Sequence, residues 1–232
     1  THVGQHIKPF NIAFDILFRS RENHPLPCMN AGVSAPKSSM KKLSLTLAAL
    51  FCAGSLSAAP TEPVAIGDIN YDTACEVAGT PLKLNGAGLR KIVFFKVYAG
   101  GLYVSEPTTD ATKVFSDEKA RRVRLGLLRD VDGADFVEAL EEGLNANLTP
   151  EKKAAIEKEV ATLKTVMQTI GDVAEGDLID FDYVPEKGTV ILRNGKPVAE
   201  PIPGKALYDA VLAIWLGDKP IDDTLKTGML GL

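Results

Sequence analysis

The sequence predicts an α+β fold in which an antiparallel sheet is covered by helices on one face. Predicted strands and helices occur in separate blocks, in the order strands, helices, strands, helices, rather than in alternation. Several predicted strands alternate polar and apolar residues, which is typical of antiparallel strands with one covered face. The chain has 232 residues, of which 45% are hydrophobic and 24% charged, a composition that suits one globular domain with its own core.

The first 59 residues are expected to lie outside this domain. Met40-Lys41-Lys42, the apolar run at 43–54 and the small residues up to Ala59 have the pattern of a secretory signal peptide over residues 40–59. The apolar run is too short for a membrane span. We expect the signal peptide to be cleaved near Ala58 or Ala59.

Residues 1–39 precede that signal and show no clean period. Two interpretations stay open: a tag, vector-derived or misannotated upstream sequence, or a genuine extension. The predicted domain therefore covers residues 60–232, and its expected location is the periplasm or the outside of the cell, without a stable membrane span.

Removing the first 59 residues limits the available chemistry. They contain His2, His6, His24, Cys28 and Cys52, so the domain keeps no histidine and a single cysteine, Cys75. This excludes an internal disulfide, a histidine-based triad and an imidazole metal site, and we expect no metal and no cofactor. The first 59 residues also hold six of the 26 Lys/Arg and two of the 30 Asp/Glu, so the domain carries a net charge of −8. That charge argues against nucleic-acid binding.

The first predicted block is made of strands. After an extended segment at 60–70, strands are predicted at Asp72–Val77, Leu82–Leu84, Ile92–Lys96 and Val97–Val104. Gly86 and Gly88 suggest a bend or bulge, and Gly100-Gly101 leave room for another backbone or a ligand. The segment Glu106–Asp110 is predicted to be a loop, and Val114–Glu118 is ambiguous.

Two predicted strands carry clustered charges. Ala120–Arg129 alternates, and we interpret Arg121, Arg122 and Arg124 as a solvated edge, with an anion site as the less favoured alternative. Asp177–Val184 also alternates, and Asp180 with Asp182 is interpreted as a pair of acids on an exposed strand. The alternative for this pair is metal binding or acid–base chemistry.

Helix signals account for most of the remainder. One helix begins after an N-cap at Asp132 and ends at 145–148, with Phe136, Leu140 and Leu144 along one face. A second begins at Thr149-Pro150 and ends at Gly171. Then follow a strand at Gly188–Arg193, a hairpin turn at Asn194-Gly195, a strand at Lys196–Val198, and helices at Gly204–Leu216 and Ile221–Met229.

Arg90 is the main candidate for a functional residue. On a strand it points the same way as Ile92 and Phe94, so a covered face would place its guanidinium beside an apolar layer. A buried guanidinium needs an acceptor, which could be a bound carboxylate or an internal Asp or Glu. The residues alone leave both possibilities open.

Two stretches, LNGAGLRK and FFKVYAGGLYV, resemble the first hairpin of the chalcone isomerase-like family. Members carry a glycine-flanked Arg followed by a strand of the form K-F-x-x-x-G-x-Y-L, and the resemblance covers the chain after residue 70. It implies an open-faced β-sandwich with a ligand cleft between the large sheet and a helical layer.

The family's enzymes close a chalcone to a flavanone with an Arg, a Thr, a Tyr and further polar residues. The resemblance places Arg90 at the Arg, but it places Tyr98 at the Thr and Phe136 at the Tyr. The other polar positions fall on Leu127, near Gly143 with Asn145 close by, and on Ile214. The family also includes fatty-acid-binding proteins that hold the ligand carboxylate with an Arg.

The leading hypothesis is therefore an exported, non-enzymatic chalcone isomerase-like protein that binds a small amphipathic, fatty-acid-like molecule. Arg90 would hold its acidic head, and the residues lining its body would be Tyr98, Phe136, Ile214 and Trp215. The first alternative is an intramolecular lyase or isomerase using Arg90 and Tyr98. The second is a structural or partner-binding protein with a collapsed cleft. The sequence does not indicate which protein such a partner would be.

Overall fold

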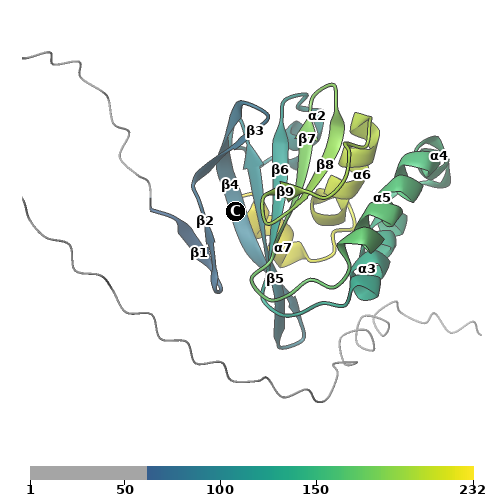
Figure 1. The fold of residues 1–232 in the computed structure, drawn as a ribbon. Coiled ribbons are helices and arrows are strands. Elements are labelled where there is room, and N and C mark those ends of the chain that lie inside the picture. The colour runs from purple at the N-terminus through teal and green to yellow at the C-terminus, as the bar shows by residue number, and fades with distance from the viewer. Residues whose placement is uncertain (1–61) are drawn as a thin grey trace, which may run out of the picture. The chain divides into compact units, whose positions relative to one another are not determined.

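The computed structural model describes residues 62–232, which fold around one antiparallel sheet (Figure 1). The predictions for residues 1–39 and 40–59 lie outside the described residues. Seven strands pair antiparallel in chain order, and a two-stranded hairpin precedes them. The hairpin consists of β1 (Val64–Ile66) and β2 (Ile69–Tyr71). The large sheet consists of β3 (Ala74–Val77), β4 (Thr80–Ile92), β5 (Phe95–Val104), β6 (Arg121–Leu127), β7 (Leu178–Val184), β8 (Gly188–Arg193) and β9 (Lys196–Pro197).

Apart from one short helix between β5 and β6, the helices of this part of the chain come in the predicted blocks. They are α2 (Ala111–Ser116), α3 (Gly133–Asn147), α4 (Pro150–Ala155), α5 (Glu157–Ile170), α6 (Lys205–Leu216) and α7 (Asp223–Met229). Helices α3, α5 and α6 lie together on one side of the sheet (Figure 1). This arrangement confirms the predicted α+β fold. None of the helices between residues 62 and 232 has the length and apolar character needed to cross a bilayer.

Helix boundaries follow the predicted capping residues. Asp132 accepts a hydrogen bond from the Ala134 N–H, and Thr149 accepts one from the Lys152 N–H, so both N-caps are confirmed. The second predicted helix is interrupted at Ile156, which lies at φ −124° and ψ 23°, and therefore forms α4 and α5. The ambiguous segment at 114–118 is largely helical, as the end of α2.

The sheet is covered on both faces. On the helical side, Val123, Leu125 and Leu127 of β6 belong to the main core. On the opposite side, Ile69 and Tyr71 of the small hairpin pack in a second core, together with Tyr103 and Leu82. The prediction that β6 has one wet face is therefore wrong, because β6 lies between β5 and β7 and the hairpin covers its second face.

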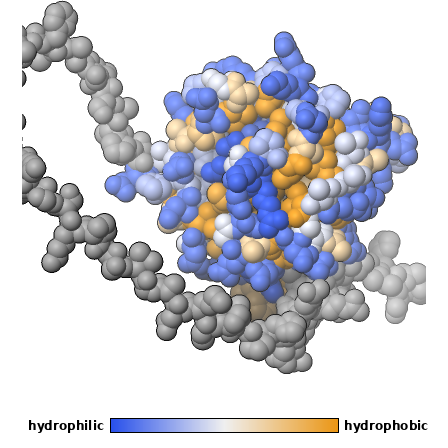
Figure 2. Space-filling model, viewed as in Figure 1, coloured by the Kyte–Doolittle hydropathy of each residue, from blue (hydrophilic) through white to orange (hydrophobic). Residues whose placement is uncertain are grey.

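The charged residues of β6 and β7 pair across the sheet. Arg122 donates two hydrogen bonds to Asp182, at 2.6 and 2.7 Å, and Arg124 donates two to Asp180, at 2.7 and 2.8 Å. The register places each Arg opposite its Asp. The interpretations as a solvated edge and as exposed acids are wrong, because these bidentate ion pairs are buried or nearly so. In Figure 2, hydrophilic residues occupy the middle of the face in view, and hydrophobic residues reach the surface on both sides.

The β4–β5 hairpin differs from the prediction at its turn. β4 continues without a break to Ile92, Val93 and Phe94 form the turn, and β5 begins at Phe95. A separate strand at Ile92–Lys96 is therefore wrong, and so is a covered position for Phe94, whose side chain is 91% exposed.

Glycines in β4 and β5 permit close packing by other parts of the chain. The register shifts between Leu84 and Gly86, as the expected bulge requires, and a Cβ on Gly86 would overlap the Gly228 carbonyl oxygen of α7. A Cβ on Gly101 would lie 2.5 Å from the Tyr71 ring. The space at Gly101 is thus filled by Tyr71 rather than by a ligand. Asn85 fixes α7 further, because its Nδ2 donates to the Met229 carbonyl at 2.8 Å.

Candidate functional site: an apolar cavity with one cationic end

A cavity of about 150 Å³ lies between the sheet and the helices. Strands β4 to β7 form one wall, and α3, the end of α6 and the segment before α7 form the other. All five residues predicted for ligand binding line it: Arg90, Tyr98, Phe136, Ile214 and Trp215. The rest of the lining is mostly apolar and comprises Ile92, Val97, Leu125, Leu127, Val131, Ala139, Leu140, Phe181 and Ile221, with Asp135 and Glu142 as its acids.

Strand register explains why Arg90 and Tyr98 meet. Arg90 of β4 lies directly opposite Tyr98 of β5, so both side chains project from the same face of the sheet. Tyr98 in turn lies opposite Leu127 of β6, which belongs to the core on the helical side. The alternation of residues along these strands therefore directs Arg90 toward the helices.

Helix packing closes the cavity on the side opposite the sheet. Phe136 lies in the first turn of α3, and Ile214 and Trp215 lie in the last turn of α6. A Cβ on Gly143 would come within 2.7 Å of Ile214 Cγ2, so the absence of a side chain on α3 lets Ile214 pack against it. Gly143 therefore makes room for the Ile214 side chain in the lining of the cavity.

Arg90 has an internal partner and also faces the cavity. Its Nη1 lies 3.3 Å from Asp222 Oδ2 and donates to the Lys91 carbonyl oxygen at 3.0 Å. Its side chain is only 16% exposed. Among the described residues these hydrogen bonds use Nη1 alone, so Nε and Nη2 keep their donors for another acceptor. Both possibilities left open by the sequence are thus compatible with the geometry.

Asp222 also caps a helix, and this second contact fixes the position of its carboxylate. It is the N-cap of α7, and its Oδ1 accepts a hydrogen bond from the Leu225 N–H at 3.0 Å. In the sequence, Asp222 is simply the second residue of the helix predicted at Ile221–Met229. Its contact with Arg90 joins residues 132 positions apart, and no local pattern in the sequence indicates such a contact.

Tyr98 is a neutral phenol at the same end of the cavity. Trp215 Nε1 donates to its oxygen at 3.0 Å. Burial raises the pKa of Tyr98 to about 12, although the Trp215 hydrogen bond and the charge of Arg90 act in the opposite direction. Tyr98 therefore keeps its proton at neutral pH, and this O–H can be donated to an acceptor in the cavity.

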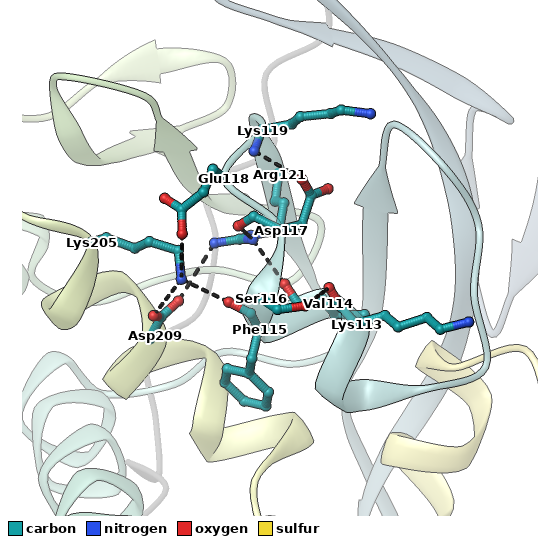
Figure 3. A network of polar contacts seen from close by, with 10 residues as sticks. All are labelled: Lys113, Val114, Phe115, Ser116, Asp117, Glu118, Lys119, Arg121, Lys205 and Asp209. Atoms are coloured by element: carbon teal, nitrogen blue, oxygen red, sulfur yellow. Dashed lines mark hydrogen bonds and ion pairs between the residues drawn. The ribbon is translucent and has the colours of Figure 1, made fainter.

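A second polar cluster lies at Arg121, and the structure explains it as a packing element (Figure 3). The Arg121 side chain is fully buried and donates to the carbonyl oxygens of Val114, at 2.8 Å, and Asp117. Lys205 donates to the Phe115 carbonyl oxygen at 2.7 Å and to Asp209 at 2.7 Å. Two cations thus satisfy carbonyl groups at the C-terminal end of α2. The solvated position predicted for Arg121 is wrong.

The profile of the chalcone isomerase-like family matches residues 63–231. The chain belongs to the chalcone isomerase-like family. The match confirms the resemblance drawn from the first hairpin.

One solved structure similar to this chalcone isomerase-like protein is the crystal structure of a fatty-acid binding protein from Arabidopsis thaliana. It aligns with a TM-score of 0.52 and 13% sequence identity, over 70% of this chain and 92% of that one. At this identity the likeness establishes the shared fold. A comparison with curated proteins found no match.

Proposed function

We propose that this chalcone isomerase-like protein is an exported, non-enzymatic binder of a small amphipathic acid of the fatty-acid type. The observation that carries the proposal is the cavity itself, which is lined mainly by apolar side chains and has one guanidinium and one neutral phenol together at one end. A carboxylate can accept from the free nitrogens of Arg90 and from the Tyr98 O–H, while the apolar lining covers the carbon chain. The fatty-acid binding protein that shares the fold supports this ligand class.

The size of the cavity favours a short ligand. A dry apolar cavity of about 150 Å³ is large enough for a benzene molecule. A short aliphatic acid or a single ring with a carboxylate fits that volume, whereas a long acyl chain would have to extend past the cavity or displace side chains. Octanoate is therefore the first ligand to test.

The residues around Arg90 support binding rather than turnover. Leu127, Phe136 and Ile214 offer no hydrogen-bond donor that would stabilise a developing enolate. A phenol that holds its proton up to pH of about 12 is a poor general base near neutrality. The presence of a cavity beside Arg90 also favours binding over the alternative of a collapsed cleft.

The test measures octanoate binding by the fluorescence of Trp215, the only tryptophan of the chain and part of the cavity lining. Wild-type protein should bind octanoate more tightly than octanol, which lacks the carboxylate. Arg90→Ala should lose about 10- to 100-fold in octanoate affinity, the range expected for hydrogen bonds to a charged group. The matched control is Lys187→Ala, which removes an exposed cation in the turn before β8.

Equal octanoate binding by Arg90→Ala and wild type would refute the proposal. Turnover of a chalcone by the wild type would instead establish the isomerase alternative. Export is tested separately by the mass of the N-terminal peptide of protein recovered from its own cell, which should begin near residue 60.

A further inference from the structure

The tip of the β4–β5 hairpin presents three consecutive hydrophobic side chains to solvent. Val93, Phe94 and Phe95 are 56%, 91% and 53% exposed, and they are three of the five large hydrophobic residues exposed within residues 62–232. The hairpin extends beyond the ends of the neighbouring strands (Figure 1). A contiguous apolar group on a projecting tip marks an interaction site.

The backbone of the turn holds these side chains outward. Val93 and Phe94 form a two-residue turn between Ile92 and Phe95, and Val93 has φ +55° whereas Phe94 does not have a positive φ. Glycine is the usual residue at the first position of such a turn, and a β-branched side chain there is strained. Val93 thus occupies a backbone conformation that favours glycine, which has no side chain.

Cations surround the apolar tip. Lys91 and Lys96 lie directly opposite each other on the two strands, both are exposed, and neither forms an ion pair with any carboxylate among the described residues. Like charges directly opposite on a hairpin repel, so an anion near both would stabilise the pair. Arg129 adds a third cation, with its Cζ 5.5 Å from the centre of the Phe95 ring.

The acids that follow Arg129 accept hydrogen bonds from backbone N–H groups, and neither forms a salt bridge with Lys91, Lys96 or Arg129. Asp130 accepts a hydrogen bond from the Glu175 N–H, and Asp132 accepts one from the Ala134 N–H as the N-cap of α3. Both side chains are thereby held in the loop before α3. The tip therefore combines aromatic side chains with cations, the composition of segments that lie at a membrane interface.

We infer that this hairpin tip docks onto a lipid bilayer with anionic headgroups, with Phe94 at its most deeply inserted point and Lys91 and Lys96 at the level of the phosphates. The area of the tip favours a bilayer over a protein partner. Three such side chains offer roughly 500 Å², whereas a specific protein interface buries about 800 Å² on each partner. A bilayer requires no complementary surface, since apolar insertion and attraction to anionic lipids are sufficient.

Docking at this tip would bring the cavity close to the membrane. Ile92, the last residue of β4, lines the cavity and immediately precedes the turn. The membrane contact is independent of ligand binding, so the two proposals can succeed or fail separately.

The first experiment is co-sedimentation of the full chain with vesicles of phosphatidylcholine alone or with added phosphatidylglycerol. Phe94→Ser should reduce binding about tenfold, from the loss of one large apolar side chain, and the exposed position makes the substitution compatible with folding. Lys91→Gln and Lys96→Gln should each reduce binding to the anionic vesicles about fivefold, and salt should weaken wild-type binding. The control is Leu232→Ser, which removes an apolar side chain that is 72% exposed elsewhere.

The second experiment reports on the tip alone and so excludes any contribution from the N-terminal residues. Phe94→Trp adds an exposed fluorophore to a chain whose single tryptophan is buried. Its emission should shift to shorter wavelength on anionic vesicles and be quenched by brominated lipid. An unshifted, unquenched signal from the introduced indole, or vesicle binding by Phe94→Ser equal to that of Leu232→Ser, would overturn the inference. Self-association abolished by Phe94→Ser, without vesicle binding, would do the same and would identify the tip as a protein interface.

Discussion

Arg90 Nη1 and Asp222 Oδ2 lie 3.3 Å apart at the polar end of the cavity, so the guanidinium proposed to bind a ligand already has an anionic neighbour. A bound carboxylate must share Arg90 with Asp222 or displace it. The side chains of both residues are largely shielded from solvent, which makes the competition stronger than it would be at the surface.

Asp222→Asn should therefore increase the affinity for octanoate, by about three- to tenfold, because it removes a competing charge. Asparagine is as good an N-cap as aspartate, so α7 should keep its stability. The measurement is the Trp215 fluorescence titration, with Asp223→Asn as the control, since that neighbour is exposed and forms no ion pair among the described residues. Weaker or unchanged binding in Asp222→Asn would show that Asp222 does not compete for Arg90.

Tyr98→Phe should weaken octanoate binding by about five- to tenfold while leaving octanol binding little changed. The substitution removes one hydrogen bond to the carboxylate and leaves the apolar lining intact. It should also cost about 1–2 kcal/mol in the free energy of unfolding, because Trp215 Nε1 loses its acceptor. Calorimetric titration with both ligands, and urea unfolding of the free proteins, would measure these effects. An equal loss for octanoate and octanol would mean that the hydroxyl only supports packing.

Stability should fall as the pH rises from about 10 to 12. Burial raises the pKa values of Tyr98 and Tyr103 to about 12, from 10.0. Between these values the unfolded chain releases phenolic protons that the folded chain keeps, so the unfolding equilibrium shifts toward the unfolded state. This contribution is fully present below pH 10 and is lost as the pH passes through 12.

Urea unfolding at pH 8 and pH 11 would measure this loss, and it should be smaller in Tyr98→Phe, which has no phenolic proton at that position. Absorbance of tyrosinate in the folded protein offers an independent check. Normal ionisation of all tyrosines near pH 10 in the folded state would contradict the prediction.

Asp182→Ala should cost about 3–5 kcal/mol in the free energy of unfolding, because it leaves the buried Arg122 charge without its bidentate partner. Replacing both Arg122 and Asp182 with apolar residues should cost less than the single change, since no charge then stays unpaired in the interior. Glu200→Ala, at an exposed position, is the control and should change stability by less than about 0.5 kcal/mol. A single-variant cost no larger than that of the control would mean that Arg122 finds another partner.

Local signals predicted the order of the elements and many of their limits. The caps at Asp132 and Thr149 and the turn at Asn194-Gly195 each depend on a few neighbouring residues, and each occurs where the sequence placed it. The turn at Val93-Phe94 was not predicted, because neither residue is typical of a turn with positive φ.

Contacts between distant segments account for the other differences. Alternating charges on β6 fit an exposed face until Asp180 and Asp182 are known to lie opposite Arg124 and Arg122. For the site, strand alternation and family resemblance together identified Arg90 and Tyr98. The contact of Asp222 with Arg90 could not be predicted, because it depends on the packing of α7 against β4. Side-chain contacts of that kind leave no period in the sequence.

The close contact of α7 with β4 has a consequence for how the cavity can widen. The Gly86 backbone touches that of Gly228, and Asn85 bonds to the last turn of the same helix, which makes this flank rigid. Among the other lining residues, Phe136 is only partly buried and lies in the first turn of α3, so we expect its side chain to move when a larger ligand binds. Selectivity for ligand length is therefore expected to depend on how easily the Phe136 side chain changes its rotamer.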